Sequence, residues 1–243
     1  MHLGIDARNK ELEMSYLCLK KNPKSYPSWH HRQWALSALS MGGHRPVSGR
    51  SAIDVEWNNE IRLLKKLLAV DGRNFHAWKY LHWVCGQIDA KTLFDAQISS
   101  PSYPPARSGS KIFACIINEC LGVNFSNYSA WHYLCRQHPN KEKILEQSRN
   151  AVFTSPFDQS AWFAYNSILK TVSHEDIKLE IELLEELRKE EPRCPYLLLT
   201  LVGASNLLHD HRYGAEYKSS LFSSLKEIDP MRVGMYAHLS AGQ

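Results

Sequence analysis

Long apolar runs are missing from this chain of 243 residues. No stretch approaches the roughly 18–20 apolar residues that a helix needs to cross a bilayer. The first residues, Met1–Arg8, also lack the charged-then-apolar layout of a signal peptide. The sequence therefore predicts a cytoplasmic protein without a transmembrane segment.

Long blocks of one charge are missing as well. The 29 basic and 25 acidic residues give a formal net charge of +4 at pH 7. The basic residues do not gather into the face or stripe that is typical of nucleic-acid-binding proteins, so we expect no nucleic acid among the partners. The hydrophobic share of 44% and the charged share of 22% are ordinary for a soluble globular protein.

Cysteine pairs with metal-binding spacing are also absent. None of the six cysteines belongs to a Cys-x-x-Cys pair, and without a secretory signal they are expected to be reduced, mostly buried thiols. The tightest histidine cluster, His209-Asp210-His211, lacks further ligands at helical spacing. We therefore expect no metal bound by this chain alone.

The chain does contain one short sequence motif that is repeated four times. In each copy a polar residue is followed seven positions later by a tryptophan that opens a helix, as in Asn22–Trp29, Asp71–Trp78, Asn124–Trp131 and Ser155–Trp162. Four copies in one register predict a repeat protein. The spacing between Trp131 and Trp162 is about the length of one helix–turn–helix unit. The longer spacings between the other tryptophans are interpreted as the same unit with loop insertions.

Each copy combines a helix stop with a helix start. Asn22-Pro23, Asp71-Gly72 and Ser155-Pro156 are typical of a helix end, and small polar residues just before each tryptophan can cap the next helix. A large flat side chain in the first turn can cover the neighbouring hairpin. The predicted core anchors of the repeats are therefore Trp29, Trp78, Trp131 and Trp162.

Between the motifs, apolar residues recur at helical spacing, as at Ile61, Leu64 and Leu68, and no convincing period-two strand is found. The sequence predicts an all-α fold of antiparallel helical hairpins stacked as a right-handed solenoid or crescent, similar to tetratricopeptide repeats. The predicted pairs are 8–21 with 28–40, 56–70 with 75–87, 111–121 with 128–137, 141–153 with 159–171, 175–190 with 195–208, and 212–227 with 231–239.

A single repeat domain over residues 1–243 is expected. Its motifs lie at 22–32, 71–81, 124–134 and 155–165, and more divergent hairpins follow over 175–239. Two stretches rich in Gly, Ser and Pro, 41–52 and 99–110, cannot bury much apolar area and are interpreted as loop insertions between repeats.

The motifs resemble those of the α subunits of protein prenyltransferases, and are most similar to the α subunit of Rab geranylgeranyltransferase, the type II enzyme. The resemblance covers residues 8–239. It is carried by Asn22–Arg32, Arg73–Trp78, Asn124–Tyr133 and Asp158–Trp162, with Asp229–Arg232 resembling the last hairpin.

This resemblance implies one subunit of a heterodimeric enzyme. Such an enzyme transfers geranylgeranyl from its diphosphate, bound at the subunit interface, to C-terminal cysteines of a Rab GTPase that a Rab escort protein presents. The β subunit would hold zinc, so no cofactor is expected in this chain. Two alternatives stay open: a non-catalytic helical-repeat scaffold derived from such subunits, and the α subunit shared by farnesyltransferase and geranylgeranyltransferase type I.

The resemblance also implies site residues at the leaving diphosphate. Lys24, Tyr26 and His76 would be catalytic, and Lys24, Asn74 and His76 would bind the diphosphate, because cations and neutral donors stabilise its oxygens. Lys24 offers an ammonium, and Tyr26 and His76 can donate hydrogen bonds. From the residues alone, a solvated loop lysine is the simpler interpretation of Lys24, and a helix cap is that of Asn74.

The chain departs from the family pattern in two respects. Arg32 resembles the structural arginine of a Trp-x-x-Arg signature, which can bond carbonyls between repeats or pair with a carboxylate on a neighbouring helix. The equivalent residues after the other tryptophans are Leu81, Leu134 and Tyr165. Family members also carry at least one more repeat upstream, so a shortened gene product, a divergent lineage and a non-catalytic paralogue are all left open.

Overall fold

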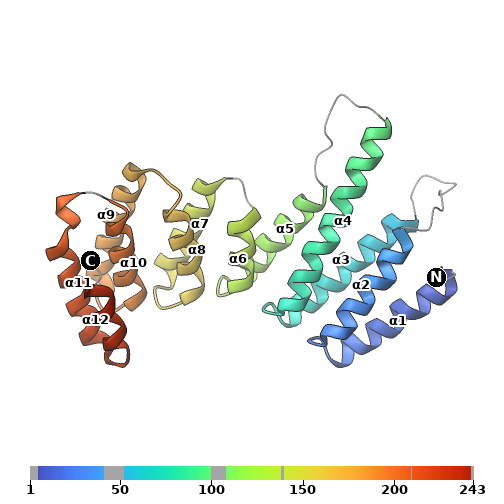
Figure 1. The fold of residues 1–243 in the computed structure, drawn as a ribbon, viewed down its shortest axis with the longest axis horizontal. Coiled ribbons are helices and arrows are strands. Elements are labelled where there is room, and N and C mark those ends of the chain that lie inside the picture. Colours follow the sequence, from blue (N-terminus) through green and yellow to red (C-terminus); the bar gives the residue numbers. More distant parts are fainter. Residues whose placement is uncertain (1–4, 41–51, 100–107, 138–139, 209, 242–243) are drawn as a thin grey trace. The chain divides into compact units, whose positions relative to one another are not determined.

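A computed structural model describes residues 5–40, 52–99, 108–137, 140–208 and 210–241, and these residues form helices joined by turns (Figure 1). No strand occurs among them. The α-helices are α1 Ile5–Lys21, α2 Tyr26–Ser40, α3 Ala52–Val70, α4 Phe75–Ser99, α5 Ser108–Val123, α6 Tyr128–Gln137, α7 Lys141–Thr154, α8 Gln159–Leu169, α9 His174–Glu190, α10 Pro195–Asn206, α11 Ala215–Ile228 and α12 Val233–Ala241.

The chain forms two compact units, Met1–Cys120 (unit 1) and Leu121–Gln243 (unit 2). In unit 1, α1 packs on α2, α3 on α4, and α2 on α4. In unit 2, α7 packs on α8, α9 on α10, and α11 on both α10 and α12. The predicted all-α fold of helical hairpins is confirmed, and each predicted pair corresponds to two consecutive helices. That all hairpins make one domain stays a prediction.

The boundaries around the second predicted loop are wrong. Helix α4 continues to Ser99 rather than ending at 87, and α5 begins at Ser108. The start of α5 is capped from α4, because the Asp89 carboxylate accepts bonds from the backbone N–H of Gly109 (2.8 Å) and Ser110 (3.1 Å). A Cβ on Gly109 would lie 2.0 Å from the Cys85 carbonyl oxygen, so only glycine allows this close approach. The rest of the loops predicted at 41–52 and 99–110 lies outside the described residues.

The four anchor tryptophans share one bond in addition to their burial. Each indole N–H donates to the backbone carbonyl six residues earlier, at 2.7–2.8 Å, and each side chain is at most 4% exposed. A buried tryptophan needs such a partner for its N–H. The bond closes each turn onto the helix that follows, and it explains why tryptophan, rather than an aliphatic residue, recurs here. The pairs are Trp29 with Pro23, Trp78 with Gly72, Trp131 with Phe125, and Trp162 with Pro156.

In two places the same carbonyl also accepts a bond from the next hairpin. Asn74 Nδ2 donates to the Pro23 oxygen at 3.0 Å within unit 1. Cys194 Sγ donates to the Pro156 oxygen, also at 3.0 Å, within unit 2. Asn74 and Cys194 occupy the same position of their repeats, four residues before Trp78 and Leu198. These carbonyls therefore join one hairpin to the next.

Arg32 makes the second connection within unit 1. Its guanidinium binds both carboxylate oxygens of Glu60 on α3, at 2.8 and 2.5 Å, and it also donates to the Leu12 carbonyl and the Ser15 hydroxyl on α1. Tyr80 on α4 donates to Glu60 at 2.9 Å. Burial alone would lower the pKa of Arg32, but the bonds and charge of Glu60 outweigh it, so the pKa is raised.

The positions equivalent to Arg32 and Glu60 vary together along the chain. Tyr165 replaces the arginine and donates to Glu180 at 2.7 Å, and Arg149 pairs with the same carboxylate. In the other two repeats the arginine position holds leucine, and the residue at the glutamate position is apolar. These pairs are Leu81 with Phe113 and Leu134 with Ile144, and all four side chains are buried. The three lost arginines are therefore replaced by a tyrosine–glutamate bond or by apolar residues on both sides.

We predict that Glu60→Ala destabilises the chain by about 3–5 kcal/mol, because it leaves the Arg32 guanidinium buried without its counter-charge. Urea unfolding measures this free energy. Glu119→Ala is the control, since Glu119 forms an exposed pair with Lys65 at 2.8 Å and its loss is expected to cost less than about 1 kcal/mol. Equal effects of the two substitutions would contradict the prediction.

Candidate functional site

The four residues implied by the family resemblance come from two neighbouring hairpins of unit 1. Lys24 lies in the turn between α1 and α2, and Tyr26 is the first residue of α2. Asn74 immediately precedes α4, and His76 lies in the first turn of α4. Because α2 packs against α4, both turns reach the same edge of unit 1.

Three of these side chains lie at that edge, in two separate contacts. The Tyr26 and His76 rings lie 6.2 Å apart, centroid to centroid, and the Lys24 ammonium lies 3.2 Å from the Asp71 carboxylate of the second turn. Lys24 and Tyr26 are exposed, at 71% for the Lys24 side chain and 57% for Tyr26, and His76 is half-buried. We call Lys24, Tyr26, Asp71 and His76 the turn surface.

The turn surface carries three groups that can donate hydrogen bonds to an anion. It offers an ammonium, a phenol hydroxyl and an imidazole, all of which can donate to phosphate oxygens. Asp71 opposes an anion by its charge, yet an exposed lysine–carboxylate pair contributes little free energy, so Lys24 can exchange Asp71 for another oxygen ligand at low cost. The sequence places Asp71 at a helix end but not at the site, although its position at the start of the second motif could have suggested a role there.

Asn74 lies apart from these three side chains. It is only 1% exposed. Its Oδ1 accepts from the backbone N–H of His76 and Ala77, and its Nδ2 donates to Pro23. Asn74 thus caps α4 and ties the two turns together, whereas its direct contact with a diphosphate stays a prediction.

The histidines after Trp29 take different partners. His30 is exposed, and its ring lies 6.1 Å from that of Tyr26. His31 bonds the Glu11 carboxylate at 2.8 Å. A shallow groove between α1 and α2 begins at Tyr26 and His30 and ends at the exposed Trp34, so an apolar surface adjoins the turn surface.

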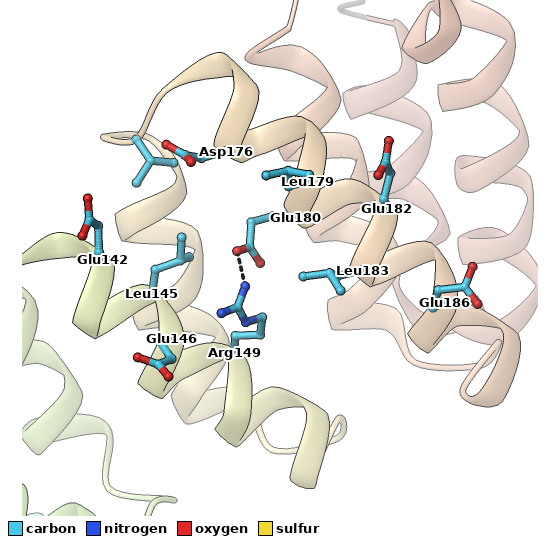
Figure 2. A pocket seen from close by; sticks show the side chains of 11 residues that line it. Glu142, Leu145, Glu146, Arg149, Asp176, Leu179, Glu180, Glu182, Leu183 and Glu186 are labelled. Carbon is cyan, nitrogen blue, oxygen red and sulfur yellow. Dashed lines mark hydrogen bonds and ion pairs between the residues drawn. The ribbon is translucent and has the colours of Figure 1, made fainter.

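A second groove lies in unit 2, between α7 and α9 (Figure 2). Carboxylates and leucines line it, and Arg149 crosses it to pair with the buried Glu180 at 2.7 Å. None of the predicted site residues lines this groove. Its carboxylates are those of Glu142, Glu146, Asp176, Glu180, Glu182 and Glu186.

Metal ligands, membrane-spanning helices and reactive thiols are the other features that bear on function. Among the residues that the structure describes, no three or more His, Cys, Asp or Glu side chains come close enough to hold a metal ion. In the same residues, no helix is long and apolar enough to span a membrane. All six cysteines are free thiols, and burial raises the pKa of Cys85 to about 12 and that of Cys135 to about 11. These two thiols are therefore poor nucleophiles.

The fold and the site together define a helical-hairpin repeat protein whose neighbouring turns present an ammonium, a phenol and an imidazole at one edge. Residues 8–39 and 57–88 match the family described as "Protein prenyltransferase alpha subunit repeat". Both matched segments hold residues of the turn surface. The chain belongs to this family of protein prenyltransferase α subunits.

Two of its relatives are subunits of the same enzyme type. The chain is 34% identical to the geranylgeranyl transferase type-2 subunit alpha of Bos taurus, over 68% of this chain and 27% of that protein. It is 27% identical to the subunit of the same name from Saccharomyces cerevisiae, over 98% of this chain and 74% of that protein. The chain thus spans about a quarter of the length of the bovine relative.

A solved structure shares the fold. A chain of the Candida albicans protein geranylgeranyltransferase-I complexed with GGPP superposes with a TM-score of 0.64, over 96% of this chain and 72% of that one. Their sequences are 18% identical, so this likeness bears on the fold alone.

We predict that Asn74→Ala destabilises the chain by about 1–3 kcal/mol, because the cap of α4 and a bond to the Pro23 carbonyl are lost together. Ser173→Ala is the control, since Ser173 is an exposed cap that bonds Asp176 of its own helix, and its loss should cost about 1 kcal/mol or less. Thermal unfolding of both variants measures the difference. A smaller effect for Asn74→Ala than for Ser173→Ala would contradict the role of Asn74 as a tie between hairpins.

Proposed function

We propose that this chain acts as the α subunit of a protein geranylgeranyltransferase type II. With a β subunit it would transfer a geranylgeranyl group from its diphosphate to C-terminal cysteines of a Rab GTPase, which an escort protein presents. The observation that carries this proposal is that Lys24, Tyr26 and His76 share one surface at the turns of two repeats that match the family. The type-2 name of the relatives supports the choice of enzyme.

The proposed role of the turn surface is to stabilise the leaving group. As the bond between the prenyl carbon and its oxygen breaks, the electron pair stays on the diphosphate, and negative charge builds there. The Lys24 ammonium and the donors of Tyr26 and His76 would face these oxygens, so their stabilisation grows toward the transition state. The attacking group is the cysteine sulfur of the substrate, whose activation we assign to zinc held by the β subunit.

The β subunit is expected to cover the turn surface. Its interface should exceed the standard total of roughly 1,600 Å², as in a permanent complex. The exposed Tyr26 and the adjoining apolar groove between α1 and α2 are compatible with such a contact. We place the complex in the cytoplasm, since six free thiols suit a reducing compartment.

One observation favours a second candidate, the non-catalytic repeat scaffold. Lys24 already has a partner in Asp71, and Asn74 is buried and bonded. If both residues serve only to hold the two turns together, the surface binds a partner without chemistry. Kinetics of the assembled complex separate the two candidates.

We predict that Lys24→Ala slows single-turnover prenyl transfer by the reconstituted complex roughly ten- to thousand-fold, or about 1.4–4 kcal/mol, with little change in binding of the lipid diphosphate. Lys24→Arg should restore only part of the rate, because the planar guanidinium of arginine does not place its charge where the compact ammonium of lysine does. Lys189→Ala is the matched control, since Lys189 forms a similarly exposed pair with Glu186. Wild-type rates for Lys24→Ala, at unchanged assembly, would leave the scaffold as the better account.

A further inference from the structure

The turn surface depends on the relative position of two separate hairpins. Lys24 and Tyr26 belong to the hairpin of α1 and α2, whereas Asp71 and His76 belong to that of α3 and α4. A shift of one hairpin along the other would separate the Lys24 ammonium from the Asp71 carboxylate, and the Tyr26 ring from the His76 ring. Misplacement of about 1 Å can cost roughly 10²-fold in rate, so whatever fixes these hairpins matters for any chemistry at this surface.

Arg32 is bonded, directly or through one carboxylate, to all four helices. It projects from α2, it donates to Leu12 and Ser15 on α1, and its fork holds Glu60 on α3. Tyr80 on α4 completes the set through its bond to the same carboxylate.

This network is buried and its geometry is directional. Arg32 is 7% exposed, Glu60 1% and Tyr80 4%. A bidentate arginine–carboxylate pair fixes orientation as well as distance. Burial and the neighbouring Glu60 charge raise the pKa of Tyr80 well above its ordinary value, so its hydroxyl stays a donor. The ring of Tyr80 on α4 also lies 5.0 Å from that of Trp29 on α2, centroid to centroid.

We propose that Arg32, acting through Glu60 and Tyr80, is a positioning residue. It holds the two turns in register and so keeps Lys24 and Tyr26 beside Asp71 and His76. The part of this proposal that concerns catalysis rests on the proposed function. The part that concerns the coupling between the two hairpins does not. Arg32 itself is buried and does not belong to the turn surface.

Unit 2 supplies a matched control. Tyr165 stands three residues after Trp162, as Arg32 does after Trp29, and it donates to the buried Glu180. Arg149 pairs with the same carboxylate, as Figure 2 shows. This network joins two other hairpins, and none of the predicted catalytic residues lies in them. Tyr165→Phe removes one bond to a buried glutamate there, as Tyr80→Phe does in unit 1.

The first test measures amide hydrogen exchange of the isolated chain and needs no activity. Arg32→Lys should speed exchange in both turns, 22–29 and 71–78, by roughly tenfold, the equivalent of one hydrogen bond to a charged group. Tyr165→Phe should leave both turns unchanged. Faster exchange in 22–29 alone would overturn the proposal, because Arg32 would then stabilise only its own hairpin. If Arg32→Lys does not fold, Tyr80→Phe takes its place with the same expectations.

The second test is a double-mutant cycle in the reconstituted complex. Arg32→Lys should slow single-turnover transfer roughly 10- to 100-fold when Lys24 is present, and have little effect in the Lys24→Ala background, because a positioning residue acts through the group it positions. The same fold-loss in both backgrounds would mean a general effect on stability and would overturn the proposal. Absence of transfer by the wild-type complex would count against the proposed function only, and hydrogen exchange then decides on Arg32.

Discussion

A guanidinium and a carboxylate meet inside unit 1, where both are shielded from bulk water. Taking two charges out of water is costly, and the cost is recovered only when their geometry and their remaining hydrogen bonds are nearly complete. Arg32 and Glu60 meet this condition through Leu12, Ser15 and Tyr80. Because any sliding of the hairpins would break several of these bonds at once, the pair restricts the hairpins to one register, and the turn surface depends on that register.

The other repeats achieve contact between helices by different means. Where the arginine position holds leucine, the glutamate position holds Phe113 or Ile144, and apolar packing replaces the ion pair. Apolar contacts are less directional than a bidentate pair, so they stabilise a repeat without fixing its register as strictly. Within unit 1, the bidentate Arg32–Glu60 pair joins the two hairpins that carry the turn surface. Positional accuracy matters for chemistry at this surface.

The repeat motif predicted most of the fold, since the helix stops, caps and tryptophans that define it are local signals. The length of α4 and the start of α5 could not be predicted, because Asp89 caps α5 from another helix. That Lys24, Tyr26 and His76 belong to one site was implied by the family resemblance. The burial of Asn74 was not expected, because its side chain bonds the Pro23 carbonyl, 51 residues away along the chain.

Photoaffinity labelling tests most directly whether the turn surface meets the diphosphate. The reconstituted complex would be irradiated with a prenyl diphosphate that carries a diazirine beside the diphosphate, and the labelled peptides would be identified by mass spectrometry. The account predicts label in this chain on the segments that hold Lys24 and His76, reduced by excess inorganic pyrophosphate. Label confined to the partner subunit, or to unit 2 of this chain, would contradict it.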